Sequence, residues 1–287
     1  YHNGRFVSIL PLLAPECGVT HVNIAAIHLN ERYGDVTLND DPYSAPKYNA
    51  VWEEVRILQS HGIKVLGMLG GAAPGTYTRL DRNADIFNSY YEPLRDMIKW
   101  CGLDGIDLDV EEHMSLAGIT RLIDRLKLDF GADFILTLAP VAPGMWGGKH
   151  MSGFSYDELE ITRGSSIAWY NTMFYCGWGS METTEDFDKI IDYGWPAERI
   201  VIGLSTNPET SGWIHGELLR GSLGAIVEIY PVLGGVMGWE YFNSITVAEP
   251  SGEQPWCWAQ LISEILHLKV RDVESSAQDK PCTAAQH

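Results

Sequence analysis

Apolar segments rich in β-branched residues alternate with amphipathic segments along most of the chain. This alternation predicts βαβ units, in which helices cover the outside of a parallel sheet. Seven segments are predicted as strands, namely residues 21–29, 64–70, 105–111, 134–140, 168–176, 199–205 and 234–241. Apolar residues at spacings of three and four predict helices at residues 49–61, 86–101, 116–130, 184–193 and 216–229, with a last helix at about 255–268.

The number of strands favours an α/β fold of the (β/α)8 TIM-barrel type that lacks its first β-strand at the N-terminus. A length of 287 residues is close to that of such a barrel. An open, doubly wound sheet would fit the same pattern and stays an alternative. We expect one catalytic barrel domain over residues 1–268 and a C-terminal tail over residues 269–287, because the tail is rich in Ser, Ala, Gln and Asp.

The charge of the chain restricts its partners. Twenty Lys and Arg residues against 38 Asp and Glu residues give a formal net charge of −18. A surface this negative repels both phosphate backbones and anionic lipid headgroups, so we expect neither nucleic acid nor a membrane as a partner. No apolar run approaches the roughly 20 residues that span a bilayer. The chain starts at Tyr1 without a basic and then apolar leader, so it shows no signal peptide.

The five cysteines do not form a recognisable pattern. They are scattered along the chain and none has the close Cys-x-x-Cys spacing of a zinc or redox site. We therefore expect buried thiols, and the sequence assigns no disulfide pairing and no compartment. The residues concerned are Cys17, Cys101, Cys176, Cys257 and Cys282.

The most informative run for chemistry is Asp-Gly-Ile-Asp-Leu-Asp-Val-Glu at residues 104–111. Alternate residues of a strand share a face, so Asp107, Asp109 and Glu111 point to one side and the apolar residues between them point to the other. Three crowded carboxylates relieve their repulsion by holding at least one proton, which raises a pKa among them. Glu111 lies nearest the carboxyl end of the strand and is the predicted general acid.

Two other interpretations of this row stay open. The acids could lie solvated on an edge strand, although a strand in the middle of the alternation is not favoured as an edge. They could also bind a hard cation such as Ca²⁺ or Mg²⁺, although a linear row does not surround an ion. Zinc is disfavoured because the chain has no His-Glu-x-x-His motif, and phosphate-loop, dinucleotide and Gly-x-Ser-x-Gly motifs are absent. We expect no metal and no cofactor.

The pattern DGxDxDxE at residues 104–111 resembles the signature of glycoside hydrolase family 18. Gly70 and Gly71 resemble the small-residue turn that lies beside the sugar in that family. Residues 136–142, 169–181 and 234–244 resemble the fungal endo-β-N-acetylglucosaminidases within it. The alignment that this resemblance implies begins after the first barrel strand of the family, in agreement with the strand count.

The resemblance implies substrate-assisted retaining catalysis, in which the 2-acetamido oxygen of the substrate attacks the anomeric carbon. Glu111 would protonate the leaving oxygen and then deprotonate water. Asp109 would accept the acetamido N–H, and Asp107 would share a proton with Asp109. Tyr175 would hydrogen-bond the acetamido oxygen, although core packing is also open for this residue.

The same resemblance implies several substrate-binding residues. Trp239 would form the floor of the sugar site, with barrel-core packing as the alternative. Asn171 and Met173 share a face with Tyr175, and Met173 stands where relatives often carry glutamine. Three further tryptophans fall in loops after strands, where both sugar platforms and ordinary loop packing fit, namely Trp146, Trp178 and Trp213.

The predicted function is hydrolysis of the β-1,4 bond in the N,N′-diacetylchitobiose core of N-glycans by an endo-β-N-acetylglucosaminidase. A chitinase acting on polymers of N-acetylglucosamine is the first alternative, because the catalytic groups are the same for both substrates. A non-catalytic carbohydrate-binding barrel is the second. The expected partner is an N-glycan or chitin-type oligosaccharide. We expect a monomer, and the resemblance favours an extracellular location.

Overall fold

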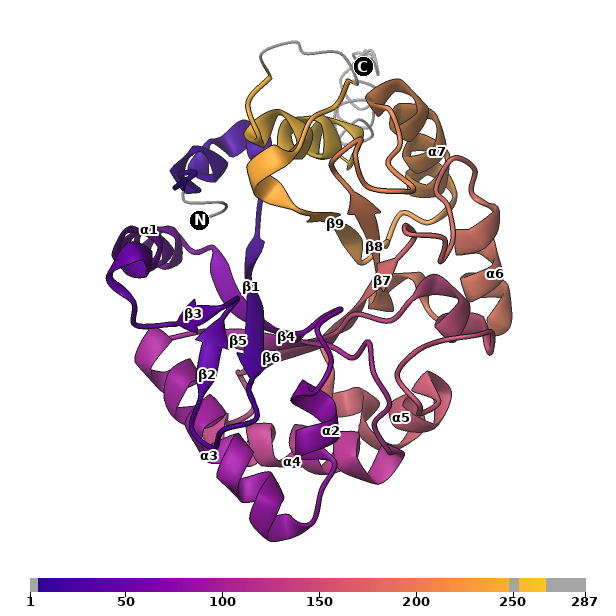
Figure 1. Ribbon diagram of the computed structural model, residues 1–287. Helices are drawn as coiled ribbons and strands as arrows, with labels where there is room; N and C mark the ends of the chain where they lie inside the picture. The colour runs from indigo at the N-terminus through magenta and orange to yellow at the C-terminus, as the bar shows by residue number, and fades with distance from the viewer. Residues whose placement is uncertain (1–4, 248–252, 267–287) are drawn as a thin grey trace, which may run out of the picture.

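The computed structural model describes residues 5–247 and 253–266. A single curled sheet forms its centre, and the helices lie on the outside of the sheet (Figure 1). The strands are ordered β3-β2-β1-β4-β5-β6-β7-β8-β9. Their bounds are β1 His21–Leu29, β2 Val36–Leu38, β3 Asp41–Pro42, β4 Lys64–Gly70, β5 Gly105–Asp109, β6 Ile135–Leu138, β7 Trp169–Met173, β8 Ile200–Ser205 and β9 Gly235–Trp239.

All seven predicted strands are confirmed, as β1 and β4 to β9. They pair in parallel in sequence order, which is the arrangement that βαβ units produce. β5 ends at Asp109, two residues before its predicted end. β2 and β3 were not predicted, and they extend the sheet beyond β1 as short antiparallel strands.

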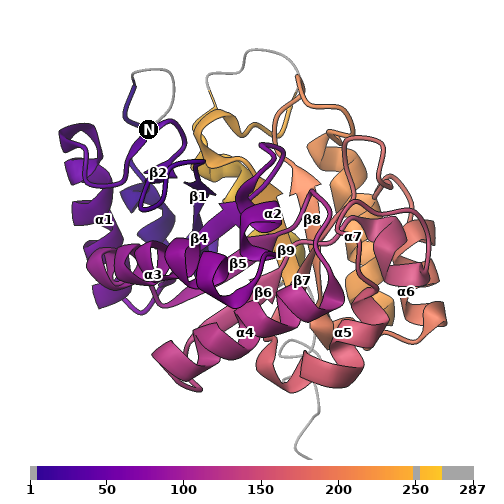
Figure 2. The same cartoon turned by 60° about the horizontal axis from the view of Figure 1, so that its bottom comes forward.

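The strands and helices follow the plan of a TIM barrel. Helices lie outside the curl rather than on both faces of an open sheet, which excludes the doubly wound alternative (Figures 1 and 2). Within the described residues, β9 forms one end of the sheet order and does not pair with β1. The N-terminal segment and the helix of residues 256–266 lie near this opening, where the Tyr241 hydroxyl donates to the Ser8 carbonyl at 2.9 Å. The lack of a first strand stays a prediction.

The predicted helices are also confirmed, although two helices were missed. α2 has five residues and α5 has eight, so neither presents a long periodic pattern. The last predicted helix is described over residues 256–266, and the remainder of its range and the predicted tail lie outside the described residues. The bounds are α1 Asn49–Ser60, α2 Thr76–Leu80, α3 Ala84–Cys101, α4 Leu116–Phe130, α5 Tyr156–Arg163, α6 Glu185–Tyr193 and α7 Gly216–Ile229.

The sheet divides the interior into two environments. On its outer face, Ile106 and Leu108 of β5 are fully buried in the apolar core between the sheet and the helices. On its inner face, polar side chains of neighbouring strands meet, among them Asp107, Thr137 and Asn171. The period-2 alternation of the sequence therefore separates the residues that stabilise the fold from those available for chemistry.

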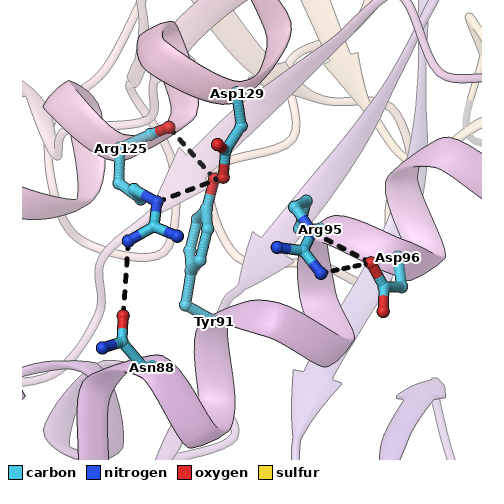
Figure 3. A network of polar contacts seen from close by, with 6 residues as sticks. All are labelled: Asn88, Tyr91, Arg95, Asp96, Arg125 and Asp129. Atoms are coloured by element: carbon cyan, nitrogen blue, oxygen red, sulfur yellow. Dashed lines mark hydrogen bonds and ion pairs between the residues drawn. The ribbon is translucent and has the colours of Figure 1, made fainter. Parts of the chain in front are cut away.

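A polar network fixes the packing of α3 against α4 (Figure 3). The Tyr91 hydroxyl lies 2.8 Å from Oδ2 of Asp129 and 3.1 Å from the Arg125 carbonyl oxygen. The Arg125 guanidinium donates to Asp129 and lies 5.1 Å from the centre of the Tyr91 ring. Because the tyrosine ring is buried and its hydroxyl is satisfied, this contact joins the two helices at no cost in unpaired polar groups.

The cysteine prediction is partly wrong. Cys17 and Cys101 are buried, Cys257 is half-buried, but Cys176 is exposed. Cys176 follows β7 in a turn with a φ of +55°, at the rim of the sheet rather than in the core. Cys282 lies outside the described residues, and no disulfide joins the four described cysteines. None of the helices in the described ranges combines the length and apolarity needed to cross a bilayer.

Candidate active site

The predicted carboxylate row lies on β5, between β4 and β6 and far from either end of the sheet order. This position excludes the edge-strand alternative. Asp107 stands opposite Met68 of β4 and Thr137 of β6, and Asp109 stands opposite Gly70. Because the three strands pair in parallel, these side chains of β4, β5 and β6 lie side by side on the inner face of the sheet.

Asp107 is 1% exposed and is held by two buried neighbours. The Thr137 hydroxyl donates to its Oδ1 at 2.5 Å, and the Asn171 amide donates to the same oxygen at 3.0 Å. Burial raises the pKa of Asp107, and the two hydrogen bonds oppose that rise because they stabilise the carboxylate. Both donors bind Oδ1 of Asp107, and the proton shared with Asp109 stays a prediction.

Asp109 has the most unusual environment of the row. It is 5% exposed, and its Oδ1 atom is buried without a hydrogen-bond partner among the described residues. Burial raises its pKa well above the usual range, and the nearby charges of Glu111 and Asp107 raise it further. A buried acceptor without a donor is costly, so this oxygen is available for a donor on a bound molecule.

Glu111 lies two residues beyond the end of β5 and is half-buried. Burial raises the pKa of its carboxyl group, in the direction that a general acid requires. The next residue has a different role. The Glu112 carboxylate accepts the backbone N–H groups of Gly75 and Tyr77, at 2.8 and 2.7 Å, and so holds the loop between β4 and α2.

Gly70 and Gly71 form a tight turn against Asp109. Both have positive φ values, of +95° and +86°. A Cβ atom on Gly70 would lie 2.5 Å from the Asp109 carbonyl oxygen, and one on Gly71 would lie 3.5 Å from Oδ2 of Asp109. The Gly71 N–H also donates to the Asp109 carbonyl at 3.0 Å. Only glycine, which has no Cβ atom, lets the loop lie this close to Asp109, and the missing side chains leave one side of the Asp109 carboxylate uncrowded.

An apolar cluster borders the carboxylates. Met173 and Tyr175 are buried in it, and Trp178 and Trp239 pack against it while remaining partly exposed. Burial raises the pKa of Tyr175 well above its usual range, and the negative charges of Asp109 and Glu111 raise it further. Met173, Tyr175 and Trp239, from the ends of β7 and β9, thus lie in one cluster, and their roles toward a substrate stay predictions. Trp178 differs from the other two loop tryptophans, Trp146 and Trp213, because it packs against this cluster.

The structure gives contacts for the other predicted site residues. Asn171 donates its side-chain amide to Asp107 and so positions this carboxylate, and its contact with a substrate stays a prediction. Trp146 packs against the outer core, and the Trp213 indole N–H donates to the Ile245 carbonyl at 3.4 Å, which fits loop packing. Thr137 was missed, because a threonine in an apolar strand carries no local signal of a partner 30 residues earlier.

Metal binding was the other alternative for the carboxylate row. In residues 5–247 and 253–266, no group of three or more His, Cys, Asp or Glu side chains is arranged to hold a metal ion. The site instead combines a buried carboxylate with an open acceptor, a half-buried carboxyl group of raised pKa, and an apolar wall with a tyrosine hydroxyl. This arrangement suits a ligand with an amide N–H and an apolar face.

The known proteins that resemble this chain include chitinases and an endo-beta-N-acetylglucosaminidase. Chitinase ChiC from Aspergillus fumigatus is 49% identical with a TM-score of 0.83, over 95% of this chain and 94% of that one. A fungal endo-beta-N-acetylglucosaminidase is 43% identical with a TM-score of 0.86, over 93% and 95%. Chitinase 2 from Rhizopus oligosporus is 23% identical over 241 residues, which are 78% of this chain. The chain spans only 41% of the length of Chitinase 2.

The family model of the glycosyl hydrolases family 18 matches residues 1–213. The matched range contains the carboxylate row, the turn of Gly70 and Gly71, and Met173 and Tyr175 among the buried members of the apolar cluster. The family match therefore covers most of the chain and the part of it that the geometry singles out. The chain belongs to the glycosyl hydrolases family 18.

Proposed function

We propose that this protein hydrolyses a β-1,4 bond next to an N-acetylglucosamine residue, by retaining catalysis in which the substrate's acetamido group is the nucleophile. The observation that carries the proposal is the unpartnered, buried Oδ1 of Asp109, beside the half-buried carboxyl group of Glu111. An acetamido N–H supplies the donor that Asp109 lacks. No second carboxylate is then needed to attack the sugar.

In the first step, Glu111 gives its proton to the glycosidic oxygen as the bond from that oxygen to the anomeric carbon breaks. The acetamido carbonyl oxygen forms a new bond to the same carbon, which yields an oxazolinium ion. Asp109 accepts the acetamido N–H and so turns the carbonyl oxygen toward the carbon. Its negative charge also stabilises the positive charge that develops on the ring.

In the second step, water attacks the anomeric carbon and the bond to the acetamido oxygen breaks. The Glu111 carboxylate takes the proton of that water and returns to its acid form. The Tyr175 hydroxyl donates to the acetamido oxygen, and Trp239 lies against the apolar face of the sugar. The raised pKa of Glu111 suits both steps, because one group must give and then take a proton.

We propose the chitobiose core of N-glycans as the substrate. This choice is supported by the 43% identity with an endo-beta-N-acetylglucosaminidase over nearly the whole of both chains. Hydrolysis of chitin oligomers is the second candidate, and the 49% identity with a chitinase favours it. Both substrates place an acetamido group at Asp109, so the row itself does not distinguish them.

Product analysis tests the proposal. The protein is incubated with a high-mannose glycopeptide and, separately, with a hexamer of N-acetylglucosamine, and the products are identified by mass spectrometry. We expect a peptide that keeps one N-acetylglucosamine from the first substrate. Release of chitobiose from the hexamer alone would support the chitinase. Binding of both without cleavage would support the non-catalytic barrel and overturn the enzyme, and Glu111→Gln serves as the inactive control.

A further inference from the structure

Two cysteines lie close together where the N-terminal segment meets the last described helix. Cys17 ends the short helix η2 (Pro15–Cys17), and Cys257 lies in the first turn of the helix of residues 256–266. The Sγ atom of Cys17 lies 4.0 Å from the carbonyl oxygen of Trp256, a residue 239 positions further along the chain. Both thiols are free, and they lie near the opening between β1 and β9 (Figure 1).

This contact brings the Cys17 sulfur close to the backbone of Cys257. In a peptide unit, the carbonyl oxygen lies roughly 2.8 Å from the next Cα atom. The Sγ atom of Cys17 is therefore at most roughly 7 Å from the Cα atom of Cys257. The Cα atoms of a disulfide lie about 4.4–6.8 Å apart. Rotation of the two side chains and a small approach of the two segments are enough to join the sulfur atoms.

The two thiols differ in their access to solvent. Cys17 is 3% exposed, and its Sγ atom also lies 3.6 Å from the Pro11 carbonyl oxygen. Cys257 is half-buried and lines a pocket of about 190 Å³ between α7 and the helix of residues 256–266. Burial raises the pKa of the Cys17 thiol, and the charges of Glu16 and Cys257 raise it further. A dissolved oxidant therefore reacts first at Cys257, and Cys17 is the buried partner.

The last described helix supports a strand of the candidate active site. Within the described residues, β9 ends the sheet order and pairs only with β8. A Cβ atom on Gly238 of β9 would lie 2.7 Å from the Trp258 ring, so this ring packs directly on the strand. The next residue of β9 is Trp239, which packs against the apolar cluster beside the carboxylates. A covalent bond at Cys257 would fix the helix on which this strand packs.

We propose that Cys17 and Cys257 form a disulfide that joins the N-terminal segment to the last described helix when the protein meets a disulfide oxidant such as oxidised glutathione. Disulfides persist in oxidising surroundings. A bond between positions so far apart in the chain restricts the unfolded state more than a local bond does. The inference does not depend on the proposed function, because neither cysteine belongs to the carboxylate row.

The oxidation proceeds by two thiol–disulfide exchanges. The Cys257 thiolate attacks one sulfur of oxidised glutathione, the bond between the two glutathione sulfurs breaks, and one glutathione leaves as a thiolate. The Cys17 thiolate then attacks the Cys257 sulfur of this mixed disulfide, and the second glutathione leaves. The two protons of the cysteine thiols end on the two glutathione molecules. Two cysteines are thus oxidised while one glutathione disulfide is reduced.

Peptide mapping identifies the bond. The full chain is incubated with oxidised glutathione or with dithiothreitol, its free thiols are alkylated, and the peptides of a tryptic digest are identified by mass spectrometry. We expect a linked pair of peptides that contain Cys17 and Cys257, after oxidation only. A link from Cys257 to Cys282, or glutathione that stays bound to Cys257, would overturn the assignment.

Thermal unfolding of the same two samples measures the effect on the fold. We expect the oxidised protein to melt at least about 4 °C above the reduced protein. The difference should disappear in Cys257→Ser and in Cys17→Ala. Each variant is compared with itself under both conditions, so a loss of stability from the substitution itself does not change the readout. Cys176→Ser is the matched control in an exposed turn, and it should keep the difference. Equal melting temperatures of the oxidised and reduced protein, or an unchanged difference in Cys257→Ser, would refute the bond.

Discussion

The side-chain amide of Asn171 donates to the carboxylate of Asp107 at 3.0 Å, from β7 to β5 across the inner face of the sheet. Thr137 of β6 donates to the same oxygen from between them. All three side chains are buried. Two donors on one oxygen hold the carboxylate in a single orientation, and Asp107 therefore acts on Asp109 as a fixed neighbouring charge.

Thr137→Val tests that relationship, because valine keeps the shape and removes the hydroxyl. We expect the free energy of unfolding to fall by about 1–3 kcal/mol, as a buried carboxylate loses a donor. Urea denaturation followed by circular dichroism measures the change. Thr172→Val is the control, since Thr172 is equally buried but has only a 3.5 Å contact to the Tyr170 carbonyl. Equal losses of unfolding free energy in the two variants would show that the hydrogen bond to Asp107 does not stabilise the fold more than the Thr172 contact does.

Glu111 and Glu112 are adjacent acids for which we expect opposite effects. Glu111→Gln removes the proton donor and should lower kcat by about 10²–10⁴ with an unchanged melting temperature. Glu112→Gln weakens the two backbone contacts that hold the loop at Gly75 and Tyr77, so it should lower the melting temperature. Initial rates and thermal unfolding are measured on both variants. A Glu111→Gln protein with full activity would refute the assigned acid.

The sequence was sufficient to predict β5 and its carboxylate row because the information for this strand is local. Polar residues at every second position of β5, with apolar residues between, specify both the strand and its two faces. The sequence also located β1 and β4 with the bounds observed, since each is a largely apolar segment of strand length. The resemblance added Tyr175 and Trp239, which lie in the cluster beside the row.

The parts that were missed depend on contacts between distant residues. β2 and β3 have three and two residues, and they are strands only because the chain folds back on β1. α2 has only five residues, and Glu112, 35 residues beyond Tyr77, holds its first turn. The partnership of Asn171 with Asp107 spans 64 residues. A polar pocket of about 450 Å³ is lined by residues 28–42 and 73–79, which are more than 30 residues apart, so no local sequence pattern predicts it.

Asp109 should make the stability of the protein depend on pH. Its folded pKa is raised by burial and by the charges of Glu111 and Asp107, so folding favours its protonated form. The stabilising contribution is complete below the unfolded pKa of about 3.9, and it is lost as the pH rises through the folded pKa. Asp109→Asn removes this dependence. The variant should therefore gain stability relative to the parent protein as the pH rises.

Thermal unfolding between pH 4 and 8 measures this difference, with Asp133→Asn on the surface as the charge-matched control. We also expect Asp109→Asn to lower kcat by roughly 10²–10³, because the acetamido group loses its charged acceptor. A variant that is more stable at neutral pH but less active would show that the Asp109 carboxylate supports activity and lowers the stability of the fold. A stability difference that is constant across this range would contradict the raised pKa.

Gly70→Ala should damage both the fold and the site. A Cβ at this position would collide with the Tyr77 ring and lie 2.5 Å from the Asp109 carbonyl, and its φ of +95° is unfavourable for alanine. Gly62→Ala is the matched control, with a φ of +88° and no atom within 4 Å of the added Cβ. The control should lose only the backbone term, about 1–3 kcal/mol. Gly70→Ala should lose more and should also lower kcat, because the collision displaces the backbone that carries the Asp109 carboxylate. Urea denaturation and initial rates on both variants measure the two effects, and an active Gly70→Ala protein as stable as Gly62→Ala would show that the turn does not constrain the catalytic strand.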